Sequence, residues 1–186
     1  MNINLAGLAI VMGVLQFIIA LNLVQANYPN YSDLTNHVSD LGVGSTAALF
    51  NTSIIILGLA MVFLAYAVYE NYKKLVFSAL LAISGIGALG VGIFPEIIMP
   101  AHFIASTLTF VCGGLAGIAA FNTLKKPWNY GGAFLGLTAL ISTASFEFDV
   151  TLGLGAGGME KVIVYSELIM LLGLGMYILT QENSVD

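Results

Sequence analysis

The chain has 186 residues, of which 59% are apolar and only 8% are charged, and its mean hydropathy is +0.96. Soluble domains carry about 25% charged residues, so this composition excludes a soluble globular protein and predicts an integral membrane protein. The five basic residues are all lysine and stand against ten acidic residues, which excludes a nucleic-acid-binding protein. A single cysteine excludes a disulfide framework and a thiolate zinc site. We expect one membrane domain over residues 1–186.

Six apolar segments are each long enough for a transmembrane helix, which needs about 20 mainly apolar residues. The predicted helices span residues 3–26, 46–70, 75–94, 101–124, 130–149 and 160–180. The first segment has no basic region before it and is longer than the apolar part of a signal peptide, so we interpret it as a retained helix. Because no segment alternates as a β-barrel strand does, the predicted fold class is all-α, a polytopic bundle of six transmembrane helices.

The lysines predict how the bundle is oriented. Lys73–Lys74 and Lys125–Lys126 follow the second and the fourth predicted helices, and the positive-inside rule assigns both loops to the cytoplasm. An even number of helices then places both termini there, in a multi-pass protein of the plasma (cytoplasmic) membrane. The segments 27–45, 95–100 and 150–159 are expected to face outward.

Hydroxyl and carboxyl side chains recur on one face of the last three predicted helices, in the half of the membrane that faces outward. Glu167 lies seven residues beyond Glu160, which places it about 10 Å deeper in the membrane. Because a charged group in hydrocarbon is costly, such a residue usually faces the bundle interior or a water-filled cavity. We therefore predict an outward-facing polar pocket; the alternative is that these groups only bond between and within helices. The predicted pocket residues are Ser106, Thr109, Ser145, Asp149 and Glu167.

Both histidines of the chain lie on the outward side, beside carboxylates. His37 and Asp40 are three residues apart, and His102 and Glu160 come from neighbouring helix ends. Imidazole and carboxylate ligands suit a divalent metal such as Zn, with an open position for water. The predicted metal ligands are His37, Asp40, His102 and Glu160, and the predicted catalytic residues are Ser39, Asp40, His102 and Glu160. The alternative is that both histidines are simple hydrogen-bond partners at helix ends.

The glycines have two predicted roles. Gly113-x-x-x-Gly117 and Gly132-x-x-x-Gly136 are spaced for the close approach of two helices in a membrane. The segment 153–158 holds four glycines and is expected to be a flexible loop before the last helix.

Three motifs are distinctive in composition and order. The first is Tyr28-Pro29-x-Tyr31 followed by His37-Val38-Ser39-Asp40-Leu41-Gly42, the second is Gly92-Ile93-Phe94-Pro95 followed by His102, and the third is Gly157-Gly158-Met159-Glu160-Lys161. In this order they resemble the motifs of the bacterial and archaeal membrane family filed as domain of unknown function 998, with Lys161 where that family usually has Arg. The resemblance covers nearly the whole chain and implies six helices, no established activity, and one site that includes His37, Ser39, Asp40, His102 and Glu160.

Two classes of function fit these features. The first is a membrane-embedded, lipid-directed hydrolase, in which a metal-bound water attacks an ester or amide of an amphiphile from the outer leaflet. The alternative is a non-catalytic accessory or structural subunit of a membrane complex, or a small-solute carrier. The apolar inner halves of the helices count against a carrier, which needs access from both sides. The expected partners are the lipid bilayer and, for an accessory subunit, other membrane subunits.

Overall fold

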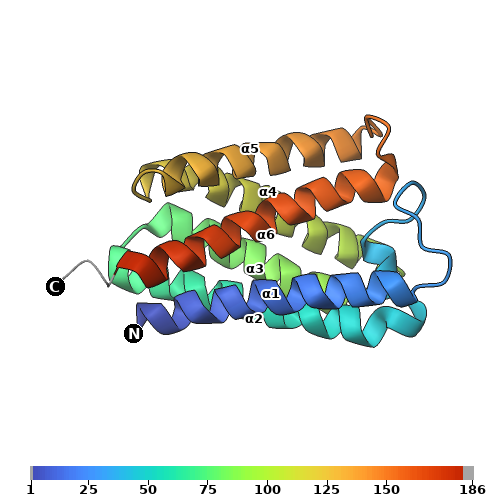
Figure 1. Cartoon of the computed structure of the whole chain (residues 1–186), viewed down its shortest axis with the longest axis horizontal. Helices are drawn as coiled ribbons and strands as arrows, with labels where there is room; N and C mark the ends of the chain where they lie inside the picture. The colour runs from blue at the N-terminus through green and yellow to red at the C-terminus, as the bar shows by residue number, and fades with distance from the viewer. Residues whose placement is uncertain (1, 182–186) are drawn as a thin grey trace.

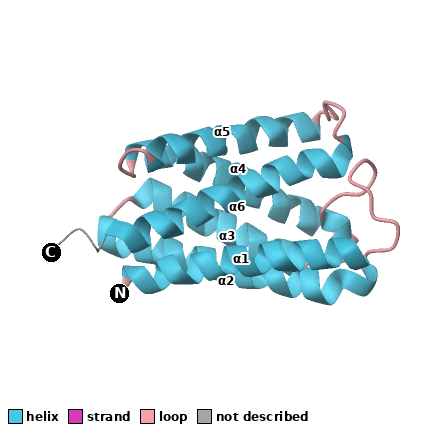
Figure 2. Cartoon of the chain, in the orientation of Figure 1, coloured by secondary structure: helices cyan, strands magenta, loops and turns pink. Residues whose placement is uncertain are grey.

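The computed structural model describes residues 2–181, and within them it is an all-helical bundle without strands (Figure 2). The long helices are α1 (Ile3–Asn27), α2 (Ala47–Tyr72), α3 (Leu75–Ile93), α4 (Met99–Ala119), α5 (Trp128–Glu147) and α6 (Gly155–Gln181). Short 3-10 helices are η1 (Ser39–Gly42), η2 (Gly44–Thr46) and η3 (Ala120–Asn122). The predicted all-α bundle of six long helices is therefore confirmed.

The helices form a closed ring in chain order. Each helix packs against the next, and α6 returns to pack against α1. Figure 1 shows α1 beginning and α6 ending at the same end of the bundle. The opposite end carries the segments 28–46, 94–98 and 148–154, and we call it the site end. Both lysine pairs lie in connections at the other end, although which end faces the cytoplasm stays a prediction.

Apolar composition makes five of these helices candidate membrane spans within the described residues. The five are α1, α2 extended to Gly44, α3, α4 extended to Asn122, and α6. The remaining long helix, α5, carries more hydroxyl side chains, among them Thr138, Ser142 and Thr143, and falls short of the same hydropathy. Large aliphatic and aromatic side chains are exposed all around the bundle, as a lipid-facing surface requires. The chain is a multi-pass membrane protein.

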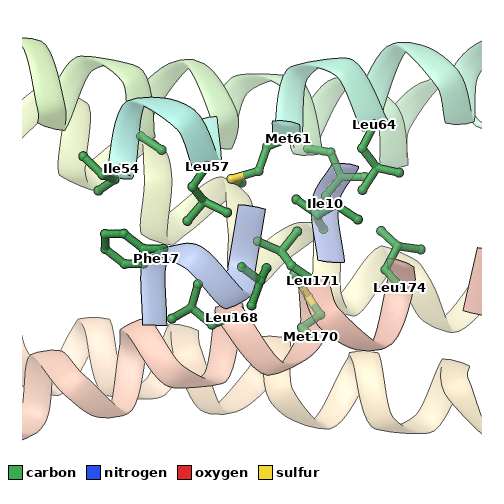
Figure 3. Packing of buried hydrophobic residues seen from close by; sticks show 14 of the residues in the cluster. Ile10, Phe17, Ile54, Leu57, Met61, Leu64, Leu168, Met170, Leu171 and Leu174 are labelled. Carbon is green, nitrogen blue, oxygen red and sulfur yellow. The ribbon is translucent and has the colours of Figure 1, made fainter. Parts of the chain in front are cut away.

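The core lies between α1, α2 and α6. Figure 3 shows Leu57 and Met61 of α2 facing Leu168 and Leu171 of α6, with Phe17 of α1 beside them. All five side chains are buried. This contact joins the first, second and last helices of the ring, and buried side chains of α3 and α4 belong to the same core.

Glycines set the contact between α4 and α5, as predicted. A Cβ on Gly117 would lie 2.6 Å from Gly136 Cα and 2.8 Å from the Gly132 carbonyl oxygen, so the two backbones meet directly. Gly113 differs from this prediction, because it faces the carboxyl group of Glu167 on α6.

The largest difference from the predicted boundaries lies at the start of the last helix. We expected a flexible glycine loop and a helix from residue 160, but α6 begins at Gly155. Gly155 has a φ of +75°, which glycine adopts without strain, and its backbone packs against Leu34. The glycines are needed for close packing here. Elsewhere α4 ends at Ala119 and continues as η3, and α5 ends at Glu147, before the predicted 149.

Candidate functional site

The segment 28–46 is attached to the first turns of α6. The backbone N–H of Gly158 donates to the carbonyl oxygen of Asp33 at 3.0 Å. A Cβ on Gly157 would collide with the carbonyl oxygen of Asn36, so only glycine permits this approach. Lys161 adds an ion pair, since its Nζ lies 2.6 Å from Asp33 Oδ1. These contacts fix the segment that carries His37, Ser39 and Asp40.

Glu160 holds the same segment by a hydrogen bond from inside the bundle. Its side chain is 6% exposed, and its Oε2 accepts a hydrogen bond from the backbone N–H of Val38 at 2.6 Å. Val38 is itself buried and lies between His37 and Ser39. The Glu160 carboxyl group therefore positions two polar side chains of the site.

Three half-buried side chains form a cluster at the site end. His37, Asp40 and Glu96 each offer a ligand atom, and these atoms all lie within 4.8 Å of one another. His37 Nδ1 lies 3.5 Å from Glu96 Oε1. Glu96 follows α3, so the cluster joins the loop after α1 to the loop after α3. We call these three residues the His-Asp-Glu cluster.

Hydrogen bonds orient both carboxyl groups of the cluster. Asp40 Oδ2 accepts from Asn36 Nδ2 at 2.9 Å and from the backbone N–H of His37 at 3.1 Å. The hydroxyl of Ser39 donates to Glu96 Oε2 at 3.2 Å. Each carboxyl group is thus held on one side by donors from the segment 36–39.

The two carboxyl groups differ in their affinity for a proton. Burial raises the pKa of Glu96, and the neighbouring Asp40 carboxyl group raises it further. Burial also acts against ionisation of Asp40, but hydrogen bonds from Asn36, Glu96 and His37 outweigh it and hold the Asp40 pKa below its usual value. The pair therefore holds a proton on Glu96 more readily than on Asp40.

His102 has a defined tautomer. Its Nδ1 lies 2.9 Å from the carbonyl oxygen of Phe94. A carbonyl oxygen only accepts, so Nδ1 carries the hydrogen and Nε2 of the neutral ring is left as an acceptor. This hydrogen bond holds the ring of a side chain that is only 7% exposed.

Two cavities meet at these residues. The outer cavity has a volume of about 170 Å³ and includes His37, Glu96, Phe103 and Glu147 in its lining. The interior cavity has a volume of about 60 Å³ and extends to Thr109, Glu167 and Leu171. Both cavities are lined by Ser39, His102, Ser106, Phe110 and Glu160. A polar mouth thus continues into an apolar interior.

The structure brings most, but not all, of the predicted site residues together. Of the predicted pocket residues, Ser106, Thr109 and Glu167 line the interior cavity. Ser145 and Asp149 belong to the lining of neither cavity: Ser145 is half-buried and Asp149 is exposed beyond the end of α5. Of the predicted metal ligands, His37 and Asp40 lie in the cluster. His102 and Glu160 line the same outer cavity but make other hydrogen bonds.

Glu96 is the residue that the sequence analysis missed. It is an isolated carboxylate after Pro95 in a connection between two helices, and such residues are usually solvated. One sequence feature could have indicated Glu96 as a site residue: it directly follows the second motif, Gly92-Ile93-Phe94-Pro95. That motif lies at the same end of the bundle as the first motif.

Comparison with known proteins identifies the family. No curated protein and no solved structure matches the chain. The profile of one family matches residues 11–177, which include all three motifs and leave out only the first two turns of α1 and the final turn of α6. The chain belongs to that family, which is described as protein of unknown function (DUF998).

Proposed function

We propose that this protein is a membrane-embedded hydrolase that cleaves an ester or amide bond in a single-chain amphiphile at the site end. One observation carries the proposal: the His-Asp-Glu cluster stands at the polar mouth of a cavity that continues into the apolar interior. With the orientation that the lysines predict, this mouth opens toward the outer leaflet.

The cluster has the donor set of a divalent-metal site. Zinc binds imidazole nitrogen and carboxylate oxygen, and three protein ligands leave its fourth position open. Asn36 and Ser39 donate hydrogen bonds to the two carboxyl groups, which is the support that ligating carboxylates usually have. A divalent metal held there would supply Lewis acidity and an activated water.

His102 is the proposed general base. The Nδ1–H bond to Phe94 leaves Nε2 free to accept a proton from the attacking water. The water oxygen bonds to the carbonyl carbon, the bond from that carbon to the alcohol oxygen or amide nitrogen breaks, and the leaving group takes the proton from His102. The products are a carboxylic acid and an alcohol or amine.

Charge and hydrophobicity point to a neutral amphiphile as the substrate. The carboxyl groups of Glu96, Glu147 and Glu160 line the mouth, and Asp40 lies beside Glu96, so an anionic headgroup would be repelled. The interior cavity is walled mainly by aliphatic and aromatic side chains, which suit a hydrocarbon chain. Monoacylglycerols and N-acylethanolamines combine a neutral head, one chain and a cleavable bond.

The test is hydrolysis of monostearoylglycerol and N-stearoylethanolamine by purified protein, after chelation and again after reloading with zinc. We expect zinc-dependent release of stearate, and a loss of about a hundredfold to ten-thousandfold in rate for His102→Gln. That variant should bind zinc as wild type does, because His102 is outside the cluster. Glu70→Gln, at the opposite end of the bundle, is the control and should hydrolyse at the wild-type rate. No zinc-dependent release by wild type would refute the hydrolase and leave an accessory membrane subunit as the better account.

A further inference from the structure

The interior cavity has one polar wall group that the proposed hydrolysis does not use. Glu167 lines this cavity from α6, is 6% exposed, and lies two turns of helix beyond Glu160. The separation of seven residues corresponds to about 10 Å along the helix axis. Glu167 is thus well below the His-Asp-Glu cluster, among apolar side chains.

One carboxyl oxygen of Glu167 has no partner. Its Oε1 is fully buried and accepts no hydrogen bond from any residue that the structure describes. Among the residues that line the cavity, His102 is the one with a basic group, and its Nδ1 is already bonded to Phe94. Burying a polar atom without a partner destabilises the protein, so a donor from outside the chain would stabilise this arrangement.

The backbone is shaped around this carboxyl group. Gly113 of α4 faces it, and a Cβ at that position would lie 2.6 Å from Glu167 Cδ. Only a residue without a side chain leaves room for the carboxyl group between α4 and α6. The site therefore combines a space made by glycine with one acceptor, Glu167 Oε1, that no residue in the described part of the chain satisfies.

The rest of the wall is apolar. Figure 3 shows part of it, where α1, α2 and α6 face one another. The side chains of this wall that the figure labels are Phe17, Ile54, Leu57, Met61, Leu168 and Leu171. Since the cavity shares five lining residues with the outer cavity, a chain whose head lies at the mouth would extend toward Glu167.

We propose that the interior cavity binds a short segment of the hydrocarbon chain of the amphiphile and that Glu167 accepts a hydrogen bond from a hydroxyl group on that segment. The inference rests on the proposed function for the position of the headgroup, and it adds the substrate class: a neutral amphiphile with a hydroxylated chain. Glu160, which lines both cavities, lies about 10 Å from Glu167 along α6, so the proposed hydroxyl group stands at mid-chain. A site built to bond a hydroxyl group discriminates against the analogue that lacks it, because its acceptor is then left unpaired.

The test is equilibrium binding to metal-free protein in nanodiscs, so that no hydrolysis occurs. The probes are radiolabelled monostearoylglycerol and analogues with one hydroxyl group at successive mid-chain positions. We expect wild type to bind the best-placed hydroxylated probe about tenfold more tightly than the plain probe, which corresponds to about 1.4 kcal/mol. Glu167→Met keeps the length of the side chain but has no carboxyl oxygen, and should bind both probes equally.

Two further variants complete the design. Glu167→Gln keeps an acceptor oxygen and should retain the preference for the hydroxylated probe. Glu70→Met makes the same Glu-to-Met change outside the cavity and should also leave that preference unchanged. Equal binding of all probes by wild type would overturn the inference, and so would a preference that persists in Glu167→Met. Selective binding without zinc-dependent hydrolysis would support this inference and reject the proposed function. Zinc-dependent hydrolysis without selective binding would support the proposed function and reject this inference.

Discussion

Glu160 Oε2 lies 2.6 Å from the backbone nitrogen of Val38, although the two residues are 122 positions apart in the chain. This hydrogen bond joins the start of α6 to the segment between α1 and α2. Because Val38 stands between His37 and Ser39, a carboxyl group that is itself buried determines where two polar residues of the mouth lie. This bond thus joins the first and last parts of the bundle, while Glu96 and His102 come from its middle.

Removing the Glu160 carboxyl group should loosen the cluster. Glu160→Leu leaves the buried N–H of Val38 without an acceptor, at a cost of about 1–3 kcal/mol in the free energy of unfolding. Glu160→Gln keeps an acceptor oxygen and should retain most of that stability. Thermal unfolding in detergent measures the difference, and equal melting temperatures for the two variants would contradict the role given to this hydrogen bond.

Gly157 should tolerate no side chain. In Gly157→Ala the new methyl group meets the Asn36 carbonyl oxygen, so the segment 28–46 must move away from α6. We expect a loss of about 1–3 kcal/mol in the free energy of unfolding together with weaker zinc binding. Gly131→Ala is the matched control, because a Cβ at Gly131 meets nothing within 4 Å. Wild-type zinc affinity in Gly157→Ala would show that the segment is not held by this contact.

Gly113 and Glu167 should be energetically coupled. Gly113→Ala places a methyl group against the Glu167 carboxyl group and should destabilise the protein by about 1–3 kcal/mol. In a Glu167→Ala background the space is vacated, so the same substitution should cost less. A double-mutant cycle on thermal unfolding measures the coupling. Additive effects of the two substitutions would mean that the carboxyl group does not occupy the space at Gly113.

Lys161 should contribute modestly to the free energy of unfolding. Its ion pair with Asp33 is partly exposed, and Nζ also lies 5.3 Å from the centre of the Tyr31 ring. Exposed pairs contribute at most about 1 kcal/mol, so Lys161→Met should lower stability by no more than that. Lys161→Arg keeps the positive charge and should match wild type in thermal unfolding. A complete loss of folded protein in Lys161→Met would contradict this estimate.

Five of the six long helices were predictable from the sequence because each is a long, strongly apolar segment, which hydropathy detects without knowledge of its neighbours; α5 is less apolar and carries a weaker signal. The start of α6 was not predictable in this way. The glycines at 155–158 have the composition of a flexible loop, and only their contacts with Leu34 and Asn36 show why glycine is needed there. Local composition carries no information about where a segment more than a hundred residues away in the sequence lies in the fold.

The site was only partly predictable, because some of its residues are brought together by contacts between segments that are far apart in the sequence. His37 and Asp40 were recognised because they are neighbours in the sequence, and Glu167 because a carboxyl group is unusual at its depth. Glu96 was missed, since its place beside His37 depends on how α3 ends relative to the loop after α1. His102 was predicted both as a ligand and as a catalytic residue. It lies outside the His-Asp-Glu cluster, and its bond to Phe94 leaves Nε2 as an acceptor, which is why we propose it as the base.

The most direct test of the account is the metal content of zinc-reconstituted protein, measured by elemental analysis for wild type, His37→Ala, Glu96→Ala and Glu147→Ala. Glu147 lines the same outer cavity but lies outside the His-Asp-Glu cluster, so it serves as a matched carboxylate control. The account predicts a single bound zinc ion per chain in wild type and in Glu147→Ala, and its loss in His37→Ala and Glu96→Ala. Zinc-free wild type, or equal zinc content in all four proteins, would contradict it.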